Sequence, residues 1–137
     1  MNGWLKLWRK FLSSDVWDNG PIMCRLWIWI LLHANYEPTT WKGIEFGVGE
    51  LFTSYNSMAE GIAWVDEKTG KRIVPPKSTI RYKVGLLVNW GNITARSQHG
   101  RLLIKVLHWG DYQGNETDTF STPSAHLQHP FNIYGNS

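Results

Sequence analysis

Nine lysine and arginine side chains stand in one stretch of the chain that contains no aspartate or glutamate. This stretch runs from residue 68 to residue 110, and acidic residues outnumber basic ones on both sides of it. Positive charge concentrated in this way is typical of a surface that binds a polyanion such as DNA. A solvated basic face without a partner is the alternative interpretation. The basic residues are Lys68, Lys71, Arg72, Lys77, Arg81, Lys83, Arg96, Arg101 and Lys105.

Residues that could carry other chemistry are scattered along the chain. Cys24 and the 5 histidines do not have the spacing of a zinc site, and His126 and His129 lack further ligand residues beside them. The carboxylates do not cluster as a metal-dependent nuclease requires. The glycines from Gly43 to Gly49 lack the lysine of a phosphate-binding loop. We therefore expect no enzyme activity, no catalytic residue, no metal and no cofactor.

The composition is that of a globular domain. The chain has 137 residues, of which 42% are hydrophobic and 18% charged. A single cysteine is typical of a reducing compartment, no secretion signal is recognised at the start, and the longest apolar run falls short of a membrane span. We therefore expect a cytoplasmic protein that does not contact a membrane.

The hydrophobic pattern predicts three helices. Pro21 begins the first, which continues with apolar residues at helical spacing. Thr53 and Ser54 offer an N-cap for a shorter second helix that runs through Ala63. Pro76 can begin the third helix, which spans residues 77–89 and ends before Gly91. Its buried face is predicted to consist of Ile80, Val84, Leu87 and Val88.

Extended segments and a tail complete the predicted architecture. Residues 41–52 predict short extended pieces, and the runs 93–96 and 102–107 predict a β-hairpin around the polar loop Ser97–Gly100. Residues 114–137 are rich in Asn, Thr, Ser, Pro, Gly and His, with apolar residues only singly spaced, which predicts a flexible tail or linker. The predicted fold is α+β, a winged helix-turn-helix over residues 1–113 with a three-helix core and a β-hairpin wing.

The third helix is predicted to enter the major groove of double-stranded DNA. Arg81 can bond two acceptors of a guanine edge, Ser78 and Tyr82 are expected to contact phosphates, and Gly85 permits close approach of the backbone. Further DNA contacts are expected from Lys77 and Thr79 in the first turn, from Arg96 and Arg101 in the wing, and from Ser54 and Tyr55 at the start of the second helix.

Several segments carry a family resemblance. They are Gly3–Leu12 (GWLKLWRKFL), Leu26–Asn35 (LWIWILLHAN), Gly49–Ser54 (GELFTS), Lys77–Arg81 (KSTIR) and Trp109–Gln113 (WGDYQ). Together they resemble the N-terminal winged-helix domain of DnaD-like proteins and phage replisome organisers, over roughly residues 3–113. The resemblance implies DNA binding in the initiation of phage or prophage DNA replication, with replication proteins as partners and contacts between copies of the chain.

Two alternatives from other classes remain open. A transcriptional regulator of the winged-helix type would bind a palindromic DNA site as a dimer. A protein-interaction or oligomerisation module would use the same helices and the tryptophans to bind a partner. Trp27, Trp29, Trp90 and Trp109 are expected to lie mainly in the core or an interface rather than to stack on bases, and tryptophans that the core does not bury would indicate self-association.

Overall fold

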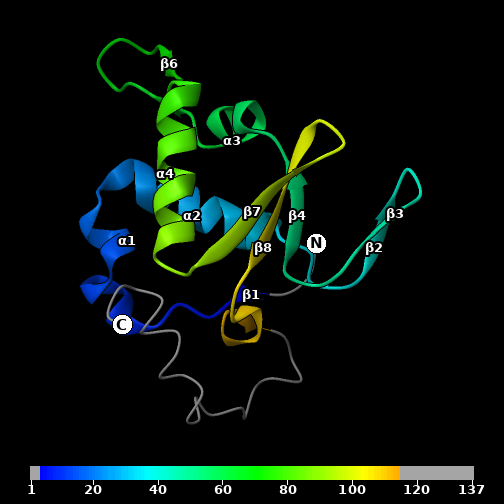
Figure 1. Ribbon diagram of the computed structural model, residues 1–137. Coiled ribbons are helices and arrows are strands. Elements are labelled where there is room, and N and C mark those ends of the chain that lie inside the picture. The colour runs from blue at the N-terminus through cyan, green and yellow to red at the C-terminus, as the bar shows by residue number, and fades with distance from the viewer. Residues whose placement is uncertain (1–3, 115–137) are drawn as a thin grey trace.

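The computed structural model describes residues 4–114, which form a mixed α+β domain of helices packed against antiparallel sheets (Figure 1). The helices are α1 (Asp15–Asp18), α2 (Pro21–His33), α3 (Tyr55–Gly61) and α4 (Lys77–Asn89), with 3-10 turns η1 (Arg9–Ser13) and η2 (Trp109–Asp111). The strands are β1 (Trp4–Leu5), β2 (Thr39–Trp41), β3 (Ile44–Phe46), β4 (Glu50–Thr53), β5 (Trp64–Val65), β6 (Arg72–Ile73), β7 (Ile93–Gln98), β8 (Arg101–Val106) and β9 (Gln113–Gly114).

The three predicted helices form as α2, α3 and α4. Pro21 occupies the first turn of α2, where its missing N–H leaves no hydrogen bond unmade. The Ser54 hydroxyl accepts a hydrogen bond from the backbone N–H of Ser57 at 3.0 Å and so caps α3. Pro76 is the N-cap residue of α4, and Gly91 follows its end with a φ of +82°.

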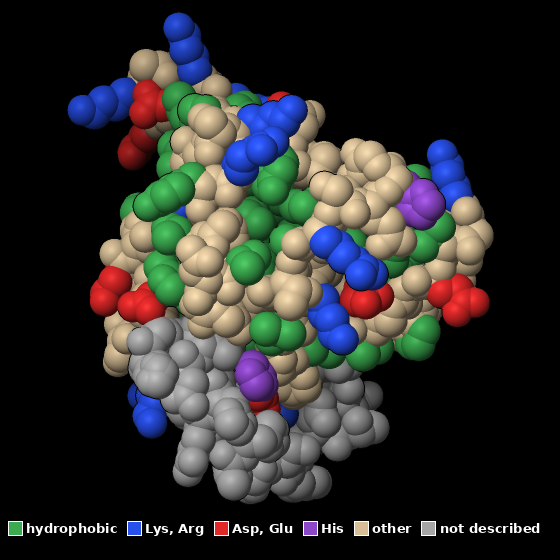
Figure 2. Space-filling model, in the orientation of Figure 1, with side chains coloured by type: hydrophobic (Ala, Val, Ile, Leu, Met, Phe, Trp, Pro, Cys, Tyr) green, Lys and Arg blue, Asp and Glu red, His purple; other side chains and the backbone are tan. Residues whose placement is uncertain are grey.

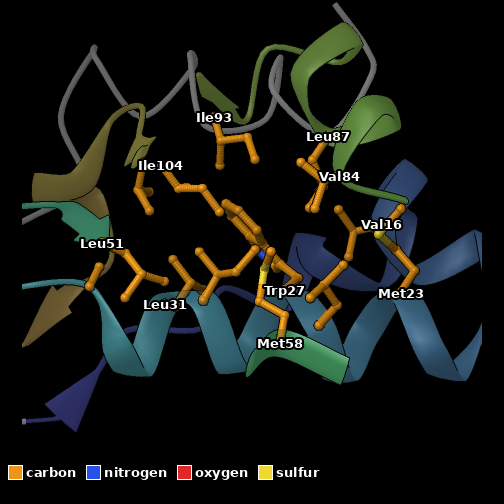
Figure 3. Packing of buried hydrophobic residues seen from close by; sticks show 14 of the residues in the cluster. Val16, Met23, Trp27, Leu31, Leu51, Met58, Val84, Leu87, Ile93 and Ile104 are labelled. Carbon is orange, nitrogen blue, oxygen red and sulfur yellow. The ribbon is translucent and has the colours of Figure 1, made fainter. Parts of the chain in front are cut away.

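Helix α2 lies at the centre of the hydrophobic core (Figure 3). Its Trp27 side chain is fully buried and meets the Tyr112 ring edge-on at 5.7 Å. The other two helices contribute buried residues to the same core, among them Met58 of α3 and Leu87 of α4. The prediction that Val88 belongs to this core is wrong, because Val88 lies one turn beyond Val84 at the edge of the buried face and remains 38% exposed.

The prediction that four of the tryptophans lie mainly in the core is confirmed. Trp27 and Trp109 are buried, and Trp29 and Trp90 are partly buried against the same core.

A three-stranded antiparallel sheet with strand order β4-β8-β7 packs against the helices. The predicted hairpin is present, but its loop is shorter than the predicted Ser97–Gly100. Only His99 and Gly100 form the turn, and both have positive φ values, 54° and 75°. Two such residues in succession are typical of the type I′ turn, which fits the right-handed twist of paired strands.

The β2–β3 hairpin covers part of the sheet face that points away from the main core. Leu103 lies on this face, because its neighbours Leu102 and Ile104 point into the core. Phe52 is the cross-strand partner of Leu103, and the Phe46 ring of β3 stacks on Phe52 at 5.1 Å. Phe46 and Leu103 are both buried although neither belongs to the main core, so they form a second small apolar cluster. We call this side of the sheet its outer face.

The two ends of the described chain pair with each other. Trp4 of β1 is the partner of Gly114 of β9, and the Lys6 N–H donates to the Tyr112 carbonyl at 2.7 Å. Of the tail predicted for residues 114–137, Gly114 therefore belongs to a strand, and residues 115–137 lie outside the described residues. Within residues 4–114, no helix has the length and apolar character needed to cross a membrane.

Candidate nucleic-acid interface

The side of α4 that points away from the core carries most of the predicted DNA-binding residues. Thr79 is partly buried, and Tyr82 is 64% exposed. No acidic residue occurs in α4. The helix therefore presents hydroxyl groups, cations and one glycine along a single stripe, which are the groups that a major groove and its phosphates accept. The exposed residues of this α4 stripe are Lys77, Ser78, Arg81, Tyr82, Gly85, Val88 and Asn89.

Arg81 is fixed at the boundary between α3 and α4. Its guanidinium carbon lies 5.0 Å from the centre of the Tyr55 ring, a cation–π geometry that joins the first turn of α3 to α4. Tyr55 itself packs against the main core. The structure thus brings these two predicted site residues together, with Arg81 still exposed.

Ser54 is committed to the cap of α3. Its hydroxyl accepts from the backbone N–H of Ser57 and donates to the Ser57 hydroxyl, both at 3.0 Å. Its single O–H is thereby used, and a phosphate, which only accepts hydrogen bonds, cannot bond to the remaining lone pair. Ser54 is therefore placed beside Tyr55 as predicted, but its first role is to stabilise the helix that carries Tyr55.

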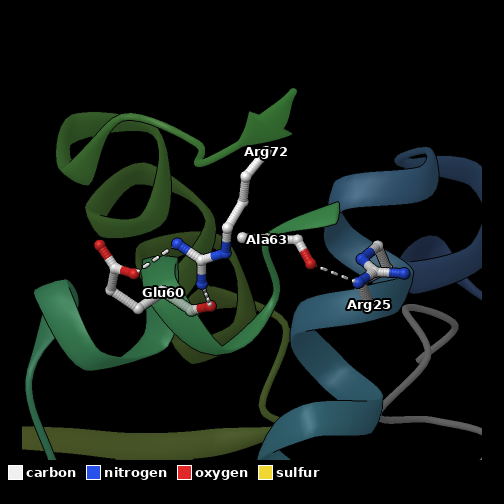
Figure 4. Close-up of polar contacts among 4 residues, drawn as sticks. All are labelled: Arg25, Glu60, Ala63 and Arg72. Atoms are coloured by element: carbon white, nitrogen blue, oxygen red, sulfur yellow. Dashed lines mark hydrogen bonds and ion pairs between the residues drawn. The ribbon is translucent and has the colours of Figure 1, made fainter. Parts of the chain in front are cut away.

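Two arginines from other elements bind groups at the C-terminal end of α3 (Figure 4). Arg72 forms an ion pair with the Glu60 side chain at 2.7 Å and donates to the Glu60 carbonyl at 2.9 Å. Arg25 of α2 donates to the carbonyls of Ile62 and Ala63 at 2.8 and 3.0 Å. These contacts satisfy carbonyl groups at the end of α3 that have no partner within the helix.

The basic segment does not act as one surface. Arg72 is engaged by Glu60, and Lys83 donates from Nζ to the side-chain oxygen of Asn19 in the turn between α1 and α2. Figure 2 shows the basic side chains of one side of the molecule in separate groups, with hydrophobic and uncharged surface between them. The number of basic residues between positions 68 and 110 therefore overstates the positive charge that one ligand could contact.

Arg96 and Arg101 of the β7–β8 hairpin point to the outer face of the sheet, and Arg101 directly follows the turn at the tip of the hairpin. Arg96 is the cross-strand partner of Leu103, and Arg101 precedes Leu103 by two residues on the same strand. The Arg101 guanidinium carbon lies 5.5 Å from the Phe52 ring centre and 6.0 Å from that of Trp41. The predicted site is therefore divided into the α4 stripe and a second group of cations on the outer face.

Trp41, whose ring lies beside Arg101 on the outer face, was not predicted as a site residue from the sequence. It is 43% exposed beside the turn formed by Lys42 and Gly43, whose φ values are 49° and 80°. The sequence does contain a pattern typical of this hairpin, the pair Lys42-Gly43 between Trp41 and Ile44. Glycine favours a two-residue turn, and the apolar residues on both sides favour strands.

The described residues contain no grouping suited to metal chemistry. Among residues 4–114, no three histidine, cysteine, aspartate or glutamate side chains gather where they could hold a metal ion. Burial raises the pKa of the Cys24 thiol, which favours the neutral thiol over the reactive thiolate.

Comparisons with protein-family models, with curated proteins and with solved structures find no match to this chain.

Proposed function

We propose that this chain is a non-catalytic protein of the winged-helix type that binds double-stranded DNA through α4. The observation that carries the proposal is the α4 stripe, an exposed and acid-free helix face that presents Lys77, Ser78, Arg81 and Tyr82 together. A helix of this kind supplies both phosphate contacts and one planar donor group able to bond a guanine edge.

The order of the elements supports the winged-helix assignment. Helix α2 is followed by β4, by α3 and α4, and then by the β7–β8 hairpin, and β8 pairs between β4 and β7. In this arrangement α3 and α4 would be the helix-turn-helix pair and β7–β8 the wing. The β5–β6 hairpin is inserted where a minimal turn would join the two helices. The family resemblance therefore implies no DNA contact for this segment.

The wing would add contacts that do not depend on base sequence. Arg96 is exposed and, within residues 4–114, no hydrogen bond, ion pair or ring contact engages it. Because Trp41 and Phe52 hold Arg101, we assign the phosphate contact of the wing to Arg96 first and to Arg101 second. The turn of the hairpin lies at the same end of the molecule as the first turn of α4 (Figure 1).

The biological setting of the proposal comes from the resemblance to DnaD-like and phage replisome-organiser domains. It places the DNA binding in the initiation of phage or prophage replication, with replication proteins as further partners. A dimeric transcriptional regulator would use the same helix on a palindrome. Footprinting separates the two, because a regulator protects two half-sites about one helical turn apart.

The direct test is the binding of a labelled random-sequence duplex by fluorescence anisotropy, over roughly 50 to 300 mM salt. Micromolar affinity that falls steeply with salt is the expected result, because released counterions dominate non-specific binding. Absence of binding even at the lowest salt would refute the proposal.

Self-association is a second candidate activity, favoured by apolar side chains near the start of the described chain. Leu7 is 55%, Leu12 is 61% and Trp17 is 47% exposed. Such side chains are candidates for an interface between copies of the chain. Sedimentation velocity over a range of concentrations tests this, and a monomer at every concentration would exclude it.

A further inference from the structure

A hollow of about 310 Å³ lies between the β2–β3 hairpin and the outer face of the sheet. This volume is at the lower end of the range of about 300–1,000 Å³ that is usual for ligand sites. Trp41, Phe52 and Arg101 contribute to its walls, and Asn35 and Thr40 add polar groups. None of these residues belongs to the α4 stripe.

The aromatic residues of the hollow are arranged as a supported platform. Phe46 is buried and stacks on Phe52 with an angle of 29° between the rings. The Phe52 ring in turn lies 5.5 Å from the Trp41 ring, tilted by 56°. Phe46 and Phe52 thereby hold Trp41 in place while 43% of its surface stays open to a ligand.

Cations flank this platform from two elements. The Lys42 ammonium lies 4.8 Å from the centre of the Trp41 ring, and the Arg101 guanidinium lies 6.0 Å from it. Arg96 shares the outer face of the sheet with Arg101. None of the described residues that line the hollow is acidic. The site therefore combines an accessible indole with positive charge that can meet a phosphate on either side.

We propose that this hollow binds a base of single-stranded DNA, with Trp41 as the ring on which the base stacks and with Lys42 and Arg101 as contacts to the adjoining phosphates. Exposed aromatic rings on a sheet face, set among cations, are the means by which many proteins bind single strands without reading their sequence. The outer face lies away from α4 (Figure 1), so Trp41 and Lys42 stand apart from the duplex-binding helix, whereas Arg101 also belongs to the proposed wing.

The test uses the whole chain and a labelled oligothymidylate of about 15 nucleotides, the length that one such domain covers. Binding is measured by fluorescence anisotropy and by quenching of tryptophan emission. Trp41→Ala is expected to weaken the binding about tenfold, because one base loses its stacking partner. Trp4→Ala is the matched control, since Trp4 is similarly exposed, at 53%, but lies in β1 and does not line the hollow. It is expected to leave the affinity unchanged.

Lys42→Asn tests the charge of the site without disturbing its fold. Lys42 has a φ of 49°, and asparagine before glycine is a preferred pair for this type of turn. The variant should keep or raise the melting temperature. It should reduce the salt slope of single-strand binding by about 0.7, the value for one phosphate contact.

The two proposed DNA sites can fail separately. Trp41→Ala should leave the affinity for a duplex unchanged, and Arg81→Ala should leave the affinity for oligothymidylate unchanged. The single-strand site is refuted if the wild-type chain does not bind oligothymidylate, if Trp41→Ala binds it as tightly as wild type, or if Trp41→Ala weakens duplex and single-strand binding equally. In each of these cases the cation–π contact of Arg101 with Trp41 serves only to hold the β2–β3 hairpin against the sheet.

Discussion

Arg81 and Tyr55 form a contact between α4 and α3, with the guanidinium carbon 5.0 Å from the centre of the ring. A contact of this kind at an exposed site is worth about 0.5–1 kcal/mol. It restricts the rotamers of the Arg81 side chain, so that part of the entropic cost of the proposed contact with DNA would be met in the free protein.

The Tyr55–Arg81 contact predicts a measurable coupling between the two side chains. A double-mutant cycle with Tyr55→Leu and Arg81→Gln should give a coupling free energy of about 0.5–1 kcal/mol in urea unfolding. The same cycle with Tyr55→Phe should keep most of the coupling, because the ring face is retained. Additive effects of Tyr55→Leu and Arg81→Gln would show that the contact does not form in solution.

Gly61 is predicted to be essential for the packing of α3 against α2. A Cβ atom at this position would lie under 3.0 Å from Nε1 and Cε2 of Trp29, and the Trp29 ring is stacked on His33 at 4.1 Å. Gly61→Ala should therefore lower the free energy of unfolding by about 1–3 kcal/mol, measured by urea denaturation. An unchanged midpoint would mean that the Trp29 ring moves aside without cost.

The local features of the fold could be predicted from the sequence because they depend on neighbouring residues. Pro76, the spacing of Ile80, Val84 and Leu87, and Gly91 together give the bounds of α4 as the structure has them. The Ser54 cap of α3 follows from the same short-range rules. Val88 was misplaced because periodicity gives the direction of a side chain but not whether another element covers it.

The tertiary features could not be predicted in this way. The pairing of Trp4 with Gly114 joins the two ends of the described chain, and no local pattern encodes it. The cation–π contact of Arg101 with Trp41 depends on how the β2–β3 hairpin folds back over the sheet. The sequence therefore gives the positions of the basic residues but not their surroundings. Only the structure shows that Lys83 donates a hydrogen bond to Asn19. It also shows that Arg96 and Arg101 lie on the outer face of the sheet.

Arg96 is predicted to contact phosphate and no base. Arg96→Ala should weaken the binding of every duplex to a similar extent and reduce the salt slope of binding by about one unit, the value expected for one lost phosphate contact. The measurement is anisotropy with several duplexes of unrelated sequence. Loss confined to one sequence would instead place Arg96 at a base edge.

Gly85 is predicted to affect stability and DNA binding in opposite directions. A Cβ atom at this exposed position of α4 meets nothing within 4 Å, so Gly85→Ala should stabilise the helix by about 0.5–1 kcal/mol. The duplex affinity should nevertheless fall, because the added methyl group would stand between the helix backbone and the groove. Melting by circular dichroism and duplex anisotropy on one preparation test both effects. Raised stability with unchanged affinity would show that this face of α4 does not approach DNA closely.

The central claim is that Arg81 presents its guanidinium from α4 to a base in the major groove, and the most direct measurement is the affinity of Arg81→Ala for duplexes. A preferred duplex is first selected from a random pool with the wild-type chain, and Arg9→Ala serves as a control with the same loss of charge in η1. Arg81→Ala should bind the preferred duplex more weakly by about 1–3 kcal/mol and lose the preference at one base pair. Arg9→Ala should retain that preference. Equal binding of the preferred duplex by wild type and Arg81→Ala would contradict the account.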